Sequence, residues 1–355
     1  MKILLFTLEY PPFRGGVANY YGSMIKYWPE PTNIFVLHNN DGKLINNKLP
    51  FLKWLPAFWY LWRAVKKEKI NHILVGHILP FGVVAYFIAK ISGVSYSVFL
   101  HGMDLSFALK TKRKKWFAKK ILNGVKNIIC GNSYTAEMAK NIVKNGEKVI
   151  VINPGAGQST INNQQSTTEL KKKYNLENKV VLLSVGRLVK RKGFDKVIEA
   201  LPQVLKEAPN LVYAIVGNGS EMPNAGLKDK VILITDADDE EKNNWYDICD
   251  IFIMPAREID GDFEGFGIVY LEANLAGKPV IAGDSGGVRD AVIDGVNGLL
   301  VNPESAGGIA AAIIKLARDE NLRKKLGEQG RERAIKDFGW KGQARKIYKL
   351  LISKS

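Results

Sequence analysis

The sequence has few of the residues that would support disulfides or a bound metal. Cys130 and Cys249 are the only cysteines among 355 residues, and no C-x-x-C pair occurs. A zinc site and a disulfide framework are therefore not expected, and the chain is expected to be cytosolic. Asp260 and Asp262 have D-x-D spacing but no partnering histidine or carboxylate strand, so we expect no metal.

Long uninterrupted apolar runs are also absent. The longest, residues 78–100, contains Pro80, Lys90 and Gly93, which argues against a membrane span. The apolar start, residues 1–7, is too short for a signal peptide and is predicted to be a buried strand.

Acidic residues are scarce in the first half of the chain. Residues 1–165 hold 22 Lys and Arg against 7 Asp and Glu, whereas residues 166–355 hold 29 against 28, so nearly all of the net charge of +16 lies in the first half. This predicts that the first half faces an anionic surface. Nucleic acid would suit the charge, but no recognised reading motif is present, and nucleic-acid binding is not expected.

The chain instead has a regular alternation of short apolar runs and amphipathic stretches. Expected strands are residues 2–8, 33–37, 73–76, 95–100, 127–130, 180–185, 211–216, 231–234, 251–254, 280–281 and 299–301. Expected helices are residues 17–27, 52–69, 82–91, 113–124, 135–144, 194–207, 241–249, 268–276, 287–293, 306–319, 320–338 and 340–353. This alternation predicts an α/β fold with two Rossmann-like doubly wound domains, whose strand ends meet at a ligand-binding cleft.

A polar connector over residues 156–168 predicts the domain boundary. We expect residues 1–158 to form an N-terminal domain and residues 159–338 a C-terminal domain. Residues 339–355 are expected to form a helix that crosses back to the first domain.

The most informative stretch runs from Glu264 to Glu272, with Gly265 and Gly267 just before a predicted helix. The glycines let the backbone approach a ligand, and the helix N-terminus offers free N–H groups to an anion. The glutamates are separated by about 12 Å along the helix axis at ~1.5 Å per residue, which suits a nucleotide diphosphate. Glycosidase carboxylates are closer, about 5–9.5 Å apart. Taken alone, the stretch is also typical of a surface helix with solvated glutamates.

Three further loops follow predicted strands. Gly15-Gly16 can bring backbone amides to a phosphate or sugar, although a glycine pair is more often just a turn. His101 could hydrogen-bond a sugar hydroxyl or move a proton, or simply be capped by its neighbours. Arg187 and Lys192 can both face one diphosphate, although a basic run is usually a solvated face.

Together the motifs form a characteristic series. They are Gly15-Gly16, His101-Gly102-x-Asp104, Gly186-Arg187-Leu188, Lys192-Gly193, the Glu264–Glu272 run, Gly286-Gly287, Asp294-Gly295-x-Asn297-Gly298 and Phe338-x-Trp340. This series resembles the GT4 family of retaining glycosyltransferases, which have the GT-B fold, over nearly the whole chain. Residues 260–298 are similar to bacterial mannosyltransferases that use GDP-mannose on phosphatidylinositol mannosides.

The resemblance implies that residues 1–158 form the acceptor-side domain and residues 159–338 the nucleotide-sugar-binding domain, and it implies a role for each matching residue. Arg187 and Lys192 would hold the donor diphosphate and stabilise the leaving group. Glu264 would hold hydroxyls of the transferred sugar, Glu272 those of the ribose, and His101 would contact the transferred sugar. His101, Arg187, Lys192 and Glu264 are thus the expected catalytic residues. The expected donor site adds Gly15, Gly16, Gly217, Asn218, Ile234, Asp236, Gly265, Phe266, Gly267, Ile268 and Glu272, and the acceptor side adds Arg14 and Asp104.

The resemblance also implies the reaction. A hexose, mannose as first choice, would move from a nucleotide-diphosphate sugar, GDP-mannose first and a UDP-sugar next, to a lipid or lipid-linked glycan. The anomeric configuration would be retained, the leaving phosphate would accept the acceptor's proton, and neither a metal nor another cofactor would be needed. Where the family has Pro-Ser, this chain has Pro255-Ala256 and a longer insert over residues 257–263, which bears on sugar specificity.

Two alternatives stay open. A nucleotide-sugar epimerase or hydrolase of similar fold would turn over the donor without an acceptor. A non-catalytic sugar- or membrane-binding protein would be expected to have lost the charged donor residues, and all of them are present.

Two stretches of the basic half are candidates for contact with a membrane. Residues 51–70 carry an aromatic stripe followed by lysines, and residues 110–120 carry seven basic residues with aromatic ones among them. Such helices lie in the interface of anionic bilayers, although a helix that covers a sheet would explain the first stretch equally well. We expect peripheral association with the inner face of the cell membrane. The expected contact residues are Trp54, Trp62, Lys112, Arg113, Lys114, Lys115 and Trp116.

Overall fold

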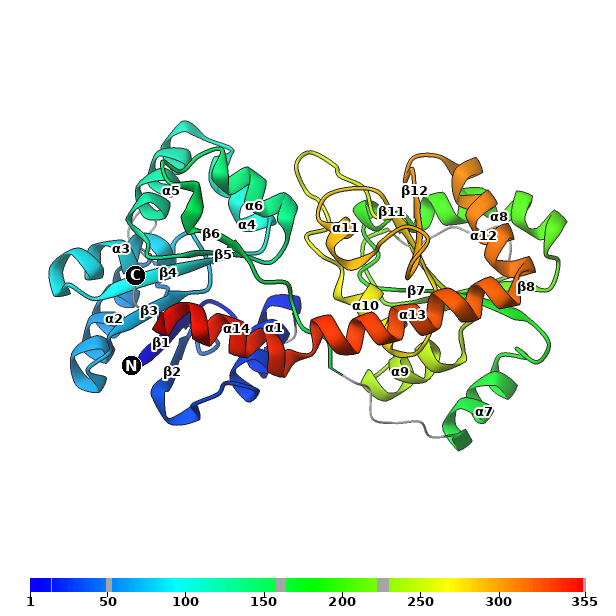
Figure 1. The fold of residues 1–355 in the computed structure, drawn as a ribbon, viewed down its shortest axis with the longest axis horizontal. Helices are drawn as coiled ribbons and strands as arrows, with labels where there is room; N and C mark the ends of the chain where they lie inside the picture. Colours follow the sequence, from blue (N-terminus) through cyan, green and yellow to red (C-terminus); the bar gives the residue numbers. More distant parts are fainter. Residues whose placement is uncertain (14, 49–52, 158–163, 222–229, 354–355) are drawn as a thin grey trace. The chain divides into compact units, whose positions relative to one another are not determined.

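The structure is a computed structural model that describes residues 1–13, 15–48, 53–157, 164–221 and 230–353. The chain divides into two compact units, one made of Met1–Gly155 with Trp340–Ser355 and the other of Ala156–Gly339. The first break thus falls after Gly155, where the polar segment begins, and the last helix of the chain belongs to the first unit. Each unit contains one six-stranded sheet with helices around it (Figure 1).

In the first unit the strands lie in the order β2-β1-β3-β4-β5-β6, and every pairing is parallel. Alternate residues of a strand face opposite sides of a sheet, and both sides are apolar here: Leu4 and Phe6 pack into one core cluster, Ile3 and Leu5 into another. Helices therefore cover both faces. The strands are β1 (Ile3–Thr7), β2 (Ile34–His38), β3 (His72–Val75), β4 (Ser95–Leu100), β5 (Ile128–Cys130) and β6 (Val149–Val151).

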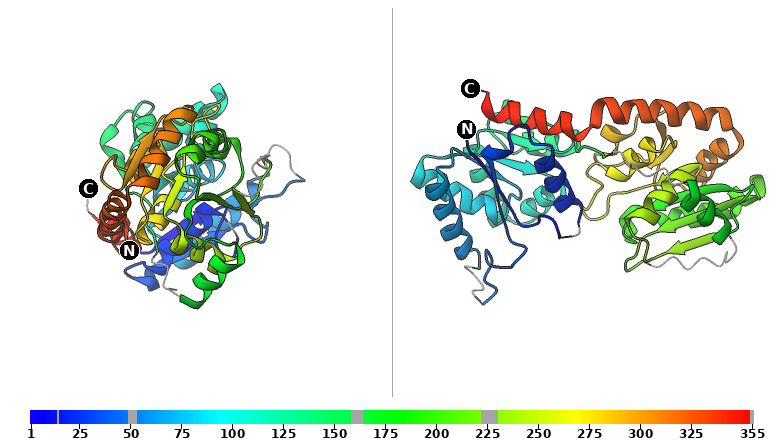
Figure 2. Two further views of the ribbon diagram at one scale, coloured as in Figure 1. Left: turned by 90° about the vertical axis from the view of Figure 1, so that its right-hand side faces the viewer. Right: turned by 90° about the horizontal axis from the view of Figure 1, so that it is seen from below.

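The helices of the first unit divide between these two faces. Those that contribute to the Leu4 side are α2 (Leu55–Glu68), α3 (Phe81–Ser92), α4 (Met103–Leu109), α5 (Lys112–Gly124) and α6 (Ser133–Lys140). The Ile3 side is covered by α1 (Gly16–Lys26) and by the C-terminal helix α14 (Trp340–Ile352). Trp340, Ile347 and Leu351 of α14 are buried there, so the end of the chain completes the core of the first unit. Figure 2 shows α14 alongside this unit from two further sides.

In the second unit the order is β12-β11-β10-β7-β8-β9, again parallel throughout. The strands are β7 (Val180–Val185), β8 (Leu211–Val216), β9 (Val231–Ile234), β10 (Ile251–Met254), β11 (Val280–Gly283) and β12 (Gly298–Val301). The helices are α7 (Gln164–Lys173), α8 (Phe194–Glu207), α9 (Asp239–Ile248), α10 (Ile268–Leu275), α11 (Val288–Ala291), α12 (Ala306–Arg318) and α13 (Glu320–Phe338). Short 3-10 turns lie at Pro31–Asn33 and Gly146–Lys148 in the first unit and at Lys190–Lys192 in the second.

The predicted strands and helices are present, and β4, β7, β8, β9, β10, α8 and α13 have the predicted bounds. The strand β6 and the helices α4 and α7 are not among the predictions. The connector predicted over residues 156–168 is wrong in its second part, because α7 begins at Gln164. These three elements are short or almost wholly polar, so they carry little of the apolar periodicity that identifies strands and helices in a sequence.

No helix in the described part of the chain is long and apolar enough to cross a membrane. In both sheets all strands point the same way, so the loops after their carboxyl ends gather along one edge. The motif loops that follow β1, β4, β7 and β10 lie at those edges.

Candidate functional site

The loops after β7 and β8 lie against each other at the carboxyl edge of the second sheet. Gly186 and Arg187 follow β7, and Gly217 and Asn218 follow β8. The backbone N–H of Leu188 donates to the carbonyl of Asn218 at 2.8 Å. Gly217 has a φ of 143°, and a side chain there would collide with the carbonyl oxygen of Gly186. Glycine at this position is therefore required for the two loops to meet.

A cluster of ion pairs joins two of the predicted catalytic residues. The Nζ of Lys192 lies 2.5 Å from the Oε2 of Glu264, and the Nη1 of Arg191 lies 2.6 Å from the same oxygen. Arg191 also reaches Asp262, with its Nε 3.0 Å from Oδ1. The side chains of Arg191, Lys192 and Glu264 are 8, 11 and 13% exposed, so these charges interact in a partly dehydrated setting.

The pKa of Glu264 reflects this cluster. Burial by itself raises it, but the charges of Lys192 and Arg191 and their hydrogen bonds together outweigh burial, so the pKa lies below its ordinary value. Glu264 is therefore ionised at neutral pH and acts as a hydrogen-bond acceptor, not as an acid. The structure brings Lys192 and Glu264 into contact, and their roles toward a donor stay predictions. Among the described residues Arg187 is exposed and takes no part in these ion pairs.

The insert after β10 holds this cluster in place. Gly193, with a φ of 75°, lies so close to Pro255 that a side chain would collide with the Pro255 carbonyl. Buried Arg257 donates its backbone N–H to the carbonyl of Arg191 at 2.9 Å, and its guanidinium donates to Asp195 at 2.7 Å. Sequence reasoning did not assign roles to Arg191, Asp262 or Arg257, since a run of basic residues does not show which carboxylate each one meets.

The helix α10 positions the second glutamate. It begins at Ile268 after Gly267, whose φ of 80° is left-handed and whose missing side chain leaves room for the Tyr270 ring. Glu272 is half-buried, and its Oε2 accepts a hydrogen bond from the hydroxyl of Tyr246 at 2.8 Å. Tyr246 comes from α9 and is buried. No signal in the sequence links it to Glu272.

The remaining predicted donor residues of this unit differ in exposure. Asn218 and Asp236 are exposed after β8 and β9. Ile234 is buried in the core, and its carbonyl accepts the N–H of Gly217 at 2.8 Å, so its side chain does not face solvent. Phe266 is also buried, whereas Gly265 and Ile268 are half-buried around the start of α10.

In the first unit, His101 follows β4 and forms a hydrogen bond that defines its protonation. The hydroxyl of buried Tyr21 donates its one proton to the carbonyl of Gly76 at 2.7 Å. The Nε2 of His101 lies 2.7 Å from the same hydroxyl and therefore donates to it. Burial, with a smaller effect from nearby His77, lowers the pKa of His101 to about 3. The ring is thus neutral, with its proton on Nε2 and the lone pair on Nδ1.

Asp104 holds the loop that carries His101. Its Oδ1 accepts the backbone N–H groups of His101 and Gly102, each at 3.0 Å. Burial raises the pKa of Asp104 to about 6 despite these hydrogen bonds. The contacts place Asp104 in the structure of the loop, and a role toward an acceptor stays a prediction.

Other polar residues share this edge of the first sheet. Gly15 and Gly16 begin α1 after β1, as the sequence predicts, while Arg14 lies outside the described residues. Glu9 and His77 follow β1 and β3. Burial raises the pKa of Glu9 and lowers that of His77 to about 4. Neither was singled out in the sequence.

The residues predicted to contact a membrane are mostly exposed. Trp62 and Trp116 are 42% and 55% exposed, whereas Trp54 is half-buried against the core. Met103 and Phe107 of α4 are exposed as well. The basic residues Lys112, Arg113 and Lys115 are exposed on α5, and the Nζ of Lys114 lies 3.3 Å from the centre of the Phe107 ring.

A metal site is not evident in the described residues, which contain no group of three or more His, Cys, Asp or Glu side chains able to hold an ion. Asp262 of the D-x-D pair is the partner of Arg191. That no metal is needed stays a prediction.

Glycosyltransferases are similar to this chain in sequence. Residues 166–333 match the family described as Glycosyl transferases group 1. A GDP-mannose-dependent alpha-(1-6)-phosphatidylinositol monomannoside mannosyltransferase of Mycobacterium tuberculosis is 26% identical over 98% of this chain and 97% of its own. A GDP-mannose-dependent monoacylated alpha-(1-6)-phosphatidylinositol monomannoside mannosyltransferase of Corynebacterium glutamicum is 26% identical over 99% of this chain and 98% of its own.

Two solved structures show the same fold. HepE of Anabaena, solved in complex with UDP, has a TM-score of 0.81 and is 20% identical, with 99% of each chain covered. WaaG, a glycosyltransferase involved in lipopolysaccharide biosynthesis, has a TM-score of 0.71 and is 16% identical, covering 99% of this chain and 100% of its own. Both have the GT-B architecture of two parallel sheets with flanking helices.

Proposed function

We propose that this glycosyltransferase, whose residues 166–333 match the glycosyl transferases group 1 family, is a retaining hexosyltransferase specific for GDP-mannose. The two phosphatidylinositol monomannoside mannosyltransferases, similar over almost the full length, support mannose and its GDP carrier. A UDP-sugar is the second choice, because HepE, of similar fold, was solved with UDP.

The observation that carries this proposal is the pairing of Glu264 with Lys192 and Arg191 beside the N-terminus of α10. A diphosphate needs cations and free backbone N–H groups, and both are close together here. Lys192 would turn from Glu264 to the donor phosphate, leaving the carboxylate to accept hydroxyls of the transferred sugar. Arg187, exposed at the end of β7, would add its guanidinium to the diphosphate.

Glu272 would accept the ribose hydroxyls. One of its oxygens already accepts from Tyr246, which fixes the carboxylate and leaves the other oxygen available. His101, neutral with a free lone pair on Nδ1, would accept a hydrogen bond from a sugar hydroxyl. We propose that the leaving phosphate accepts the proton of the acceptor, since the pKa of His101, lowered to about 3, makes it a poor base. No metal enters this scheme.

We propose that the acceptor is a lipid or lipid-linked glycan and that the enzyme binds peripherally to the inner face of the membrane. The relatives' names specify phosphatidylinositol mannosides as their acceptors. Trp116 of α5 and Phe107 of α4 are exposed, and α5 also carries exposed basic residues. Helices that lie on an anionic bilayer combine aromatic and basic residues in this way.

The test is a thermal-shift screen of GDP-, UDP-, ADP- and CMP-sugars on the wild type and on Glu272→Ala. A ligand that binds only the folded state raises the melting temperature. We expect GDP-mannose to shift the wild type and to shift Glu272→Ala less. Glu199→Ala, which removes an exposed glutamate of α8, is the matched control and should respond as the wild type does. No shift with any nucleotide sugar would contradict the proposed donor site.

A further inference from the structure

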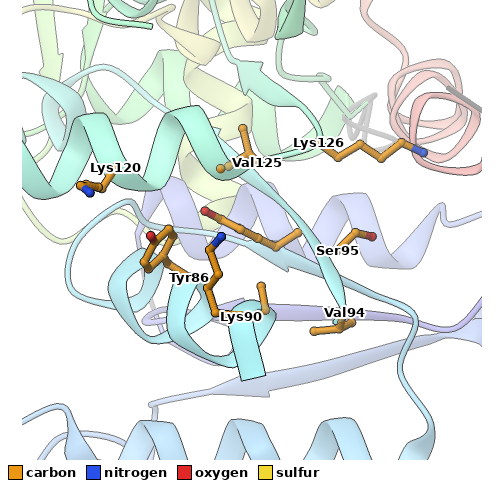
Figure 3. A pocket seen from close by; sticks show the side chains of 10 residues that line it. Tyr86, Lys90, Val94, Ser95, Lys120, Val125 and Lys126 are labelled. Atoms are coloured by element: carbon orange, nitrogen blue, oxygen red, sulfur yellow. The ribbon is translucent and has the colours of Figure 1, made fainter. Parts of the chain in front are cut away.

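A pocket in the first unit lies away from the residues discussed above. It has a volume of about 510 Å³ and is lined by the ends of α3 and α5 and by the start of β4 (Figure 3). Ser95, the first residue of β4, lines it, whereas His101 follows the last residue of the same strand. The pocket is therefore at the opposite edge of this sheet from His101.

The lining of this pocket is cationic. Lys90, Lys120 and Lys126 contribute to it, and no lining residue is acidic. Lys126 points toward α14 in Figure 3, and its Nζ donates to the carbonyls of Leu351 and Ser353, so it is already bound. In the described part of the chain, Lys90 and Lys120 have no carboxylate within ion-pair distance.

Two tyrosines line the pocket, and they differ in what their hydroxyl groups contact. Tyr96 donates its hydroxyl to the carbonyl of Ile121 at 2.7 Å and is buried. Tyr86 comes from α3, as Lys90 does, whereas Lys120 comes from α5 (Figure 3). Two ammonium groups and one phenol thus remain as donors to a ligand with several negative oxygens. A phosphate group fits this chemistry.

The surface beside the pocket is apolar on both helices. Phe87 and Ile91 of α3, which follow the lining residues Tyr86 and Lys90 in the sequence, are 42% and 66% exposed, and Trp116 of α5 is 55% exposed. The Nζ of Lys120 lies 5.2 Å from the centre of the Trp116 ring. Apolar side chains next to lysines are suited to the boundary of a bilayer, where anionic headgroups meet acyl chains.

We propose that this pocket binds the phosphate of an anionic phospholipid, with Phe87, Ile91 and Trp116 entering the adjacent lipid layer. Lys90 and Lys120 donate to the phosphate oxygens, and Tyr86 adds a hydroxyl. This proposal rests on the proposed membrane association and names the lipid group that is bound. It involves neither donor nor acceptor, so its failure would leave the proposed transfer reaction untouched.

The experiment is equilibrium binding of the full-length protein to phosphatidylcholine vesicles that carry either phosphatidic acid or phosphatidylserine at equal surface charge. Lys90→Gln/Lys120→Gln removes the free cations of the pocket. Lys112→Gln/Lys119→Gln removes two exposed charges of α5 outside it. Ala89→Leu fills the pocket, which Ala89 lines, without changing any charge. Circular dichroism checks that each variant is folded.

We expect the wild type to prefer phosphatidic acid, because its terminal phosphate exposes the most oxygens. Lys90→Gln/Lys120→Gln should bind phosphatidic acid about 30-fold more weakly, at ~1 kcal/mol per lysine, and should lose the preference. Ala89→Leu should lose the preference and keep its binding to phosphatidylserine. Lys112→Gln/Lys119→Gln should weaken binding to both lipids equally and keep the preference.

Three results would overturn the proposal. One is that both lysine pairs lower binding to both lipids by the same factor, as a diffuse basic surface would. Another is that folded Ala89→Leu keeps the wild-type preference. The third is that inorganic phosphate alone binds the wild type, and not Lys90→Gln/Lys120→Gln, while vesicles do not bind, which would make the pocket a site for free phosphate.

Discussion

The ion-pair cluster around Glu264 leads to a quantitative prediction for Glu264→Gln. The substitution keeps the shape of the side chain but leaves Lys192 and Arg191 facing each other without their shared carboxylate. Removing one partner of a buried ion pair costs about 3–5 kcal/mol. Arg191 keeps Asp262 at 3.0 Å, and the amide oxygen can still accept a hydrogen bond. We therefore expect a loss near the lower end, about 3 kcal/mol.

The assay is urea unfolding of the wild type and Glu264→Gln, followed by circular dichroism. Glu199→Gln is the control, because Glu199 pairs with Lys196 at a similar distance, 2.8 Å, but is 57% exposed. Exposed pairs contribute about 0–1 kcal/mol, so this variant should be close to the wild type. A loss below about 1 kcal/mol in Glu264→Gln would refute the view that this cluster is energetically buried.

The stability difference between the wild type and Glu264→Gln should depend on pH. The folded-state pKa of Glu264 is below its ordinary value of 4.5, so its ionised form is favoured by folding. This stabilisation is fully present above pH 4.5 and is lost as the pH falls through the lower folded-state pKa. The difference in unfolding free energy between the wild type and Glu264→Gln should therefore shrink on acidification. A difference that stays constant would show that packing, not charge, causes it.

Two other predictions concern the residues that position the proposed binding groups. Tyr246→Phe removes the hydroxyl that donates to Glu272. Since hydrogen bonds to charged groups contribute about 1.5–3 kcal/mol, we expect the Kd for a nucleoside diphosphate, measured by calorimetry, to rise about tenfold. An unchanged Kd would show that Tyr246 has no role in nucleotide binding. His101 stays neutral, because its pKa is lowered to about 3, so kcat/KM should show no titration of His101 between about pH 5 and 8. An acidic limb that disappears in His101→Gln would contradict the assigned charge state.

Much of the fold could be predicted because its strands are buried on both faces. Such strands are continuous apolar runs, as in residues 211–216, where every residue of β8 is buried. The polar helix α7 and the three-residue strand β6 lack this signal. Their formation depends on neighbours: α7 packs on α9, and β6 pairs with β5.

The candidate site was predictable only in part. Lys192, Glu264 and Glu272 could be singled out because they lie next to glycines and strand ends in a recognisable order. Arg191 and Tyr246 could not, since their importance comes from the carboxylates they contact, 73 and 26 residues away in the sequence.

The sequence by itself determined the class of fold, the order of the elements and the residue types available for binding a diphosphate, because apolar periodicity and loop position are local properties of a chain. The tertiary structure decided which charges are neutralised, which groups are buried and which proton His101 carries. Those properties depend on distances between residues far apart in sequence, such as Tyr21 and His101, and on the exclusion of water when each sheet packs with its own helices.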